Sequence, residues 1–234
     1  MDLKEVEILG ADIDAHWYYR SKARAVRRLL RSSNVGTILD VGAGSGFFSR
    51  DLLTHTGARA AWCVDTSYNA DAEASVAGKP LHFRKELAPV AADLVLLMDV
   101  LEHVDDDAGL LRACLAQVPA GCRFLITVPA FNFLWSGHDV FLEHRRRYTL
   151  AGLERVVSAA GLRIHRGHYY FGSVFPLAAV LRLLRSRDEP ARSDLKRHHA
   201  VTNSLLTAVC AAECALMRLN RLAGLSVFCL AEKC

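Results

Sequence analysis

Apolar positions along the chain alternate between short continuous runs and longer segments with helical spacing. Continuous runs that predict strands lie at 37–41, 60–65, 81–86, 93–99, 123–129 and 162–170. Segments with a helical pattern lie at 47–55, 106–118 and 150–161. Continuous apolar strands indicate burial on both faces, and their alternation with helices is typical of a parallel sheet. The pattern therefore predicts an α/β fold.

The two ends of the chain depart from this alternation. A helical pattern runs from Ala15 to Arg31, and Asn34 and Gly36 then end it. After Gly172, two apolar helical stretches flank the basic segment 185–199, which could equally be a surface loop, and 225–231 reads as a return to the sheet. We expect one domain over 1–234, with an N-terminal helical lid over 1–34 and a helical cap or insertion over about 172–222.

Composition narrows the class of protein. The chain has 234 residues, of which 52% are hydrophobic and 23% charged, as in an ordinary globular domain. Its net charge of +4 is too mild to indicate a nucleic-acid binder. Its seven cysteines show no CxxC spacing, which favours reduced thiols in a cytoplasmic protein. The apolar stretches 171–184 and 205–217 fall short of the roughly 20 residues of a membrane span.

A glycine-rich turn after the first strand is the strongest chemical signal. Asp40 ends the strand and can attract a cationic ligand group, and three glycines follow as G-x-G-x-G: Gly42, Gly44 and Gly46. Phe47 stands where a dinucleotide fingerprint needs glycine, and no phosphate-loop lysine follows. Asp65 ends the second strand, where a carboxylate can accept both ribose hydroxyls. These residues indicate a nucleoside-like ligand without a pyrophosphate.

Three motifs carry a resemblance to a known family. ILDVGAGSG (38–46), CVD (63–65) and LLMDVLEHV (96–104) resemble the class I S-adenosylmethionine-dependent methyltransferases, in particular the small-molecule branch that includes ubiquinone-type O-methyltransferases. The resemblance covers about Ala15 to Gly161. It implies a Rossmann-like, doubly wound, mostly parallel seven-stranded sheet with helices on both faces. The implied cofactor is S-adenosylmethionine.

The resemblance also implies roles for individual positions. The three glycines would line the amino-acid part of the cofactor, and Asp65 would hold its ribose. Asp99, with the backbone around Val100 and Leu101, would lie near the methionine moiety. The acidic residue usually found after the third strand has no clear counterpart in FRKELAPVAAD. The adenine contacts are therefore left open.

Methyl transfer to an acceptor often requires a general base, and histidine is the commonest. We expect the base among His138, His144 and His103, with His138 first because Asp139 adjoins it. His103 could instead serve only in packing or capping at a helix start. A metal site built from His103, His138, Asp139, Glu143 and His144 was the alternative, but no H-E-x-x-H spacing occurs, so we predict no metal.

Aromatic and cationic residues suggest contacts to the methyl acceptor. Arg145 to Arg147 could bind an anionic group, although a solvated helix face would read the same. Trp17 and Tyr18 could form an aromatic lid, although plain packing would use the same residues. The predicted substrate contacts are Trp17, Tyr18, Asp139, Arg145, Tyr148 and Tyr169.

These observations favour an enzyme that methylates a small or lipid-like molecule, most simply on oxygen. A nucleic-acid methyltransferase is the first alternative, but the mild charge and the absence of an Asn/Asp-Pro-Pro-aromatic motif speak against it. A non-catalytic membrane-surface protein is the second. The helix 20–31 carries six basic residues and no acid, so we expect a cytoplasmic protein with weak, salt-sensitive attraction to an anionic inner membrane.

Overall fold

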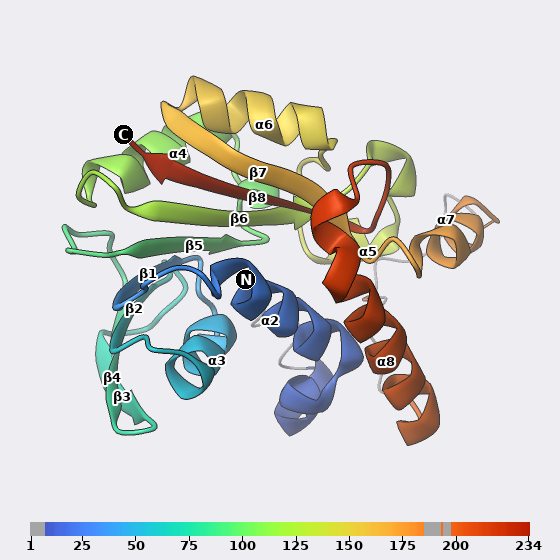
Figure 1. The fold of residues 1–234 in the computed structure, drawn as a ribbon, viewed down its shortest axis with the longest axis horizontal. Helices are drawn as coiled ribbons and strands as arrows, with labels where there is room; N and C mark the ends of the chain where they lie inside the picture. The colour runs from blue at the N-terminus through green and yellow to red at the C-terminus, as the bar shows by residue number, and fades with distance from the viewer. Residues whose placement is uncertain (1–7, 185–192, 194–197) are drawn as a thin grey trace.

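The computed structural model describes residues 8–184, 193 and 198–234, which form one sheet covered by helices on both faces (Figure 1). The strand order is β3-β4-β2-β1-β5-β6-β8-β7. The strands are β1 (Thr37–Val41), β2 (Ala60–Val64), β3 (Ala72–Val76), β4 (Lys79–Arg84), β5 (Leu94–Met98), β6 (Arg123–Pro129), β7 (Leu162–Tyr170) and β8 (Ser226–Lys233).

Helices occupy the connections between strands. The α-helices are α2 (Trp17–Leu30), α3 (Phe47–His55), α4 (Asp107–Ala116), α5 (Gly137–Phe141), α6 (Leu150–Ala159), α7 (Phe175–Leu184) and α8 (Ala200–Leu216). Four short 3-10 turns complete the described chain: η1 (Gly10–Ala15), η2 (Leu101–His103), η3 (Asn132–Leu134) and η4 (Met217–Leu219).

The central strands β4, β2, β1, β5 and β6 pair in parallel. Their carboxyl ends therefore meet at one edge, where open α/β sheets bind ligands. β8 pairs antiparallel with both β6 and β7. The doubly wound, mostly parallel α/β fold predicted from the sequence is confirmed, including helices between β7 and β8.

One strand was not expected, so the sheet has eight strands and not seven. β3 forms an antiparallel hairpin with β4 through Ala77 and Gly78, whose φ angles are 51° and 74°. Left-handed backbone at both turn residues matches the twist of a tight hairpin. β3 reads AEASV and is mostly exposed, so it lacks the continuous apolar run that revealed the other strands.

Two apolar cores cover the faces of the sheet. On one face, α2 and α3 pack with Cys210 and Cys214 of α8 against β1, β2 and β5. On the other, α4 and α6 pack against alternate residues of the same strands, for example Leu39, Val95 and Leu97. The alternation of inward side chains on both faces explains the continuous apolar runs in the sequence. Most of the basic segment 185–199 lies outside the described residues.

Candidate functional site

The glycine-rich turn leaves β1 in a backbone conformation that favours glycine at three positions. The φ angles of Gly42, Gly44 and Gly46 are 68°, 54° and 73°. A Cβ on Gly42 would lie 2.7 Å from a methyl group of Val100, so this position also has no room for a side chain. The loop crosses the end of β2, where the Gly42 amide donates to the Val64 carbonyl at 2.8 Å. Val100 thus lies against the glycine turn.

Asp65 lies beside this turn at the end of β2. Its carboxylate accepts hydrogen bonds from the Gly44 amide at 2.9 Å and from the amide and hydroxyl of Ser67 at 2.9 and 2.5 Å. Burial raises the pKa of Asp65, but these hydrogen bonds outweigh burial and hold it below its ordinary value. An oriented, ionised carboxylate next to a glycine turn fits the binding of two ribose hydroxyls.

Asp40 lies in β1, just before the glycine turn. Its side chain is buried and accepts a hydrogen bond from the Ser49 hydroxyl at 2.7 Å. Ser49 belongs to the first turns of α3, so this contact ties β1 to the helix that follows the glycine turn. Asp40 therefore supports the turn from within the core, and attraction of a cationic ligand group remains a prediction.

Asp99 directly follows β5 and forms an ion pair with Lys22 of α2, in which the Lys22 side chain is fully buried and the Asp99 side chain is 18% exposed. The Thr127 hydroxyl donates to its other oxygen at 3.0 Å. Burial raises the pKa of Asp99, but the Lys22 ammonium outweighs burial and lowers it overall. The φ of Asp99 is 58°, which turns the chain sharply at the strand end. The sequence alone does not distinguish Lys22 from the other basic residues of this helix, although its side chain is fully buried.

The aromatic residues at the start of α2 reach the same place. The Tyr18 hydroxyl lies 3.4 Å from a carboxylate oxygen of Asp99, and its ring stacks on Phe171 at 5.1 Å between centroids. Trp17 packs edge-on against Phe171 at 5.7 Å. The N-terminal helix thus places Tyr18 at the site, whereas Trp17 packs beside it and serves the predicted aromatic lid only indirectly.

His144 is held by a buried carboxylate. Its Nδ1 lies 2.8 Å from Asp139, and their side chains are 4% and 0% exposed. Arg147 donates to both oxygens of Asp139, at 2.7 and 3.0 Å. Burial raises the pKa of Asp139, but the hydrogen bonds of His144 and Arg147 outweigh it and hold the pKa well below its ordinary value. An ionised Asp139 fixes the proton of His144 on Nδ1 and leaves Nε2 as an acceptor.

The Nε2 atom of His144 belongs to a cluster with Glu102 and His103. Nε2 of both histidines and both oxygens of Glu102 are buried and lack hydrogen-bond partners among the described residues. One ligand atom from each residue lies within 4.8 Å of the others. Burial, with His144 next, lowers the pKa of His103 to about 4, and burial together with Asp99 raises the pKa of Glu102 well above its ordinary value.

This cluster changes the predicted set of catalytic and metal-binding residues. Two imidazoles and a carboxylate are a donor set that can hold a divalent cation. The metal-ligand set considered from the sequence does not include Glu102. It does include Asp139, whose carboxylate instead binds Nδ1 of His144, on the side of the ring away from the cluster. Glu102 stood in the quoted motif MDVLEH, but nothing in that spacing distinguished it from a surface acid.

His138 lies nearby, in α5. Its ring centroid is 6.3 Å from that of His144, whereas the His103 ring is 4.8 Å from His144. Asp139 directs its oxygens to His144 and Arg147, and it also caps α5 through the Ser136 amide at 2.8 Å. The adjacency of His138 and Asp139 in sequence therefore gave the wrong partner for this carboxylate: the structure pairs Asp139 with His144, five residues away.

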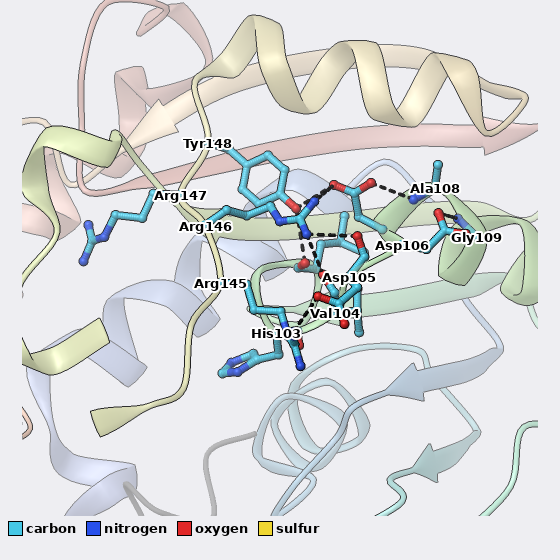
Figure 2. Close-up of polar contacts among 12 residues, drawn as sticks. His103, Val104, Asp105, Asp106, Ala108, Gly109, Arg145, Arg146, Arg147 and Tyr148 are labelled. Carbon is cyan, nitrogen blue, oxygen red and sulfur yellow. Dashed lines mark hydrogen bonds and ion pairs between the residues drawn. The ribbon is translucent and has the colours of Figure 1, made fainter. Parts of the chain in front are cut away.

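Arg145 and Arg146 hold the loop that follows η2, as Figure 2 shows, whereas Arg147 points away from that loop and binds Asp139. Arg145 donates to the His103 carbonyl at 2.8 Å and pairs with Asp105. Arg146 donates to the carbonyls of Val104 and Asp105 at 3.0 and 2.9 Å. The Arg145 amide donates to the Glu102 carbonyl at 2.7 Å. The run lies in a loop and not on a helix face. The guanidinium of Arg145 binds these protein groups but its side chain is still 51% exposed, so its contact with a substrate stays a prediction.

Three other predicted site residues point into the second core. Tyr148 donates to the Leu101 carbonyl at 3.2 Å and to Asp107 at 2.8 Å, and the Leu101 side chain is itself fully buried. The Tyr169 hydroxyl accepts from the Leu150 amide at 2.9 Å. A groove of about 760 Å³ between α4 and α6 includes Tyr148 in its lining but no glycine of the turn. Tyr148 and Tyr169 therefore brace this face of the sheet, and their contacts with a substrate stay a prediction.

Comparison with known proteins identifies the family of this chain. Residues 15–166 match the family described as a methyltransferase domain. The chain belongs to this family. It is 38% identical over 102 residues to a ubiquinone biosynthesis O-methyltransferase of Methylobacterium sp. (strain 4-46), a match that spans 39% of this chain and 41% of that relative's length.

Solved methyltransferases share the fold. A SAM-dependent methyltransferase from Archaeoglobus fulgidus superposes with a TM-score of 0.56 at 16% identity, covering 99% of this chain and 98% of that one. Haemonchus contortus phosphoethanolamine N-methyltransferase 2, in complex with S-adenosyl-L-methionine, gives 0.53 at 15% identity and covers 90% and 52%. The chain thus contains a methyltransferase domain and shares its fold with methyltransferases that use S-adenosylmethionine.

The geometry of the glycine turn and Asp65 fits this cofactor. S-adenosylmethionine supplies a methyl group on a positively charged sulfur. The left-handed glycines leave the turn bare, since a side chain at Gly42 would collide with Val100. Asp65 is ionised and oriented for ribose hydroxyls. The Asp99 carboxylate is already paired with Lys22 and Thr127, so its contribution to the methionine end would come from the shape of the strand end.

Proposed function

We propose that this methyltransferase acts on a hydroxyl of a small or lipid-like molecule and that His144 removes the proton. The carrying observation is the His144 side chain, whose Nδ1 is bound by Asp139 while Nε2 has no hydrogen-bond partner among the described residues. A neutral imidazole in this tautomer is ready to accept a proton. The partial match to a relative named as an O-methyltransferase supports oxygen as the accepting atom.

The surrounding residues suit such a proton transfer. His103 stays neutral near pH 7, because burial lowers its pKa to about 4. Glu102 tends to keep its proton, because burial raises its pKa. The cluster around His144 thus carries little charge of its own, and the acceptor hydroxyl enters a site where water is largely excluded. Asp139 and Arg147 keep the imidazole in place, as the third group does in a catalytic triad.

The test is transfer of a labelled methyl group from S-adenosylmethionine into extracted metabolites and lipids. His144→Ala should lower transfer by roughly 10²–10⁴-fold, the usual contribution of a general base. Binding of S-adenosylhomocysteine should change little, because Asp65 and the glycine turn lie on other loops. His138→Ala is the matched control and should retain most activity. Loss of activity in His138→Ala with a fully active His144→Ala would assign the base to His138.

The same experiment separates a base from a metal site. Glu102, His103 and His144 could bind a divalent cation that activates the acceptor oxygen. Prolonged chelation should leave transfer unchanged if His144 acts as the base. Loss on chelation, restored by zinc or manganese, would replace the base by a bound cation. Labelling of purified RNA or DNA in place of small molecules would favour the nucleic-acid alternative.

A further inference from the structure

Helices α7 and α8 expose an unusual amount of apolar surface. On α8 and η4, Val201, Leu205, Leu216 and Leu219 are 62–79% exposed, while the opposite side of α8 packs into the first core. On α7, Leu177, Leu183 and Leu184 are 63–79% exposed, and Ala179 is its one buried residue. Contiguous apolar surface of this kind marks an interaction site. We call these exposed side chains of α7, α8 and η4 the apolar surface.

The region Ala200–Leu219 is also long and apolar enough, by length and composition, to cross a membrane. It is longer than the apolar run 205–217 read from the sequence. However, α8 is attached to the domain: Glu213 accepts hydrogen bonds from the Gly172 and Ser173 amides at 2.7 and 2.9 Å. The Tyr170 hydroxyl also donates to the Cys210 carbonyl at 2.9 Å. These contacts suit a helix that lies on a membrane surface and not one that spans it.

A row of arginines borders the apolar surface. Arg20, Arg24, Arg28 and Arg31 are all exposed and share one face of α2 and its end. Arg28 donates to the Ala215 carbonyl at 3.1 Å, which places this row directly beside α8. α2 contains no acidic residue. Apolar side chains flanked by arginines are the pattern of a helix held at an anionic lipid surface.

The apolar surface lies at the edge of the sheet that carries the candidate site. Figure 1 shows α7 and α8 at the right, toward which the parallel strands point, and α2 near the centre, next to α8. The Trp17 amide donates to Asn203 of α8 at 2.8 Å. Phe171, which precedes α7, stacks on Tyr18 beside Asp99. The aromatic side chains of Trp17, Tyr18 and Phe171 therefore lie between Asp99 and the first residues of α7 and α8.

We propose that the apolar surface and the arginine row dock this methyltransferase onto an anionic lipid bilayer. Charge complementarity favours a bilayer over a second copy of the chain. Two copies would bring the same arginines together, whereas anionic headgroups neutralise them. Docking would place the carboxyl edge of the sheet near the bilayer. Delivery of a lipid-like acceptor from that bilayer is the one part that rests on the proposed function.

The test is flotation of the full-length protein with vesicles of phosphatidylcholine, with and without phosphatidylglycerol. Binding should require phosphatidylglycerol and weaken with salt. Arg20→Gln/Arg24→Gln should weaken it by about 25-fold, at about fivefold for each arginine. Leu205→Gln/Leu216→Gln should weaken it by at least about tenfold through loss of buried apolar surface. Circular dichroism and binding of S-adenosylhomocysteine check that each variant folds.

Arg112→Gln/Arg155→Gln is the matched control, with the same change of charge on α4 and α6 of the other face. It should bind vesicles as the unmodified protein does. Equal loss in this control, or absence of binding to anionic vesicles, would overturn the proposal. A stable dimer in sedimentation that Leu205→Gln/Leu216→Gln dissociates would assign the surface to a second copy. Vesicle binding needs no methyl acceptor, so its result is independent of the role of His144.

Discussion

The two halves of the candidate site are built in different ways. The cofactor half consists of the glycine turn and Asp65, whose hydrogen bonds to other described residues span at most 24 positions of sequence and use mainly backbone groups. The acceptor half joins η2 to residues 139–147 through arginine side chains that reach back about forty positions. Backbone conformation therefore specifies the first half locally, whereas the second exists only when distant loops meet. Methyltransferases can vary the second half without disturbing the first.

The largest expected effect comes from the ion pair that joins α2 to the strand end between these halves. Lys22→Met should destabilise the protein by about 3 kcal/mol, the lower end of the range for a broken buried pair, because it leaves the largely buried Asp99 carboxylate without its cation. Urea denaturation measures the change in free energy of unfolding. Lys22→Met/Asp99→Asn should recover part of the loss, because no buried charge is then unpaired. A single variant as stable as the unmodified protein would contradict the burial of this pair.

A smaller effect separates cofactor binding from the acceptor half. Asp65→Ala should weaken binding of S-adenosylhomocysteine by about 1–3 kcal/mol in calorimetry, the scale of hydrogen bonds to a charged group. Asp139→Asn should leave this affinity unchanged and lower methyl transfer, because it removes the carboxylate that fixes the tautomer of His144 and holds Arg147, and neither residue contacts the glycine turn or Asp65. Equal loss of affinity in both variants would show that the halves are not independent.

The smallest effect concerns pH. His103 has its pKa lowered from 6.5 to about 4 by burial, so below pH 6.5 the unfolded chain takes up a proton that the folded protein does not. Stability should therefore be full above pH 6.5 and fall as the pH drops toward 4. For this partly buried imidazole the loss is about 1 kcal/mol. His103→Gln should flatten the curve in that window.

His168 provides the comparison outside the site. Burial lowers its pKa to about 4 as well, and its ring stacks on Phe228 at 5.5 Å. His168→Gln should flatten the same window of the stability curve without changing methyl transfer. A pH dependence of stability that neither substitution alters would show that both imidazoles are more accessible to water than their burial indicates.

The difference between the two halves also explains which parts of the fold and of the site can be predicted from the sequence. The turn at Gly42, Gly44 and Gly46 can be predicted from the sequence, because glycine is the residue that adopts a left-handed backbone conformation without steric cost. The parallel strands were readable because burial on both faces leaves a continuous apolar run. β3 escaped notice because its side chains are mostly exposed.

The contacts of the acceptor half are harder to predict from the sequence. The sequence suggests that Asp139 supports its neighbour His138. In the structure residues 142–147 fold back, so that the oxygens of Asp139 bind His144 and Arg147. Lys22 was indistinguishable from the exposed arginines of α2, because only the packing of that helix on Asp99 buries it. Glu102 becomes a candidate site residue only in the folded protein, where the contacts of Arg145 with the loop after η2 bring His144 beside it. Contacts between distant loops leave no local pattern in a single sequence.

The position of β8 has a consequence for how the chain acquires this structure during synthesis. β8 is the last strand along the described chain, yet it lies between β6 and β7. β7 therefore has no neighbour in the sheet until residues 226–233 have left the ribosome. The glycine turn and Asp65 can assemble much earlier, since β1 and β2 pair directly. A nascent chain would thus gain a cofactor site well before its sheet can close, with an open β6 edge exposed to other chains in the interval.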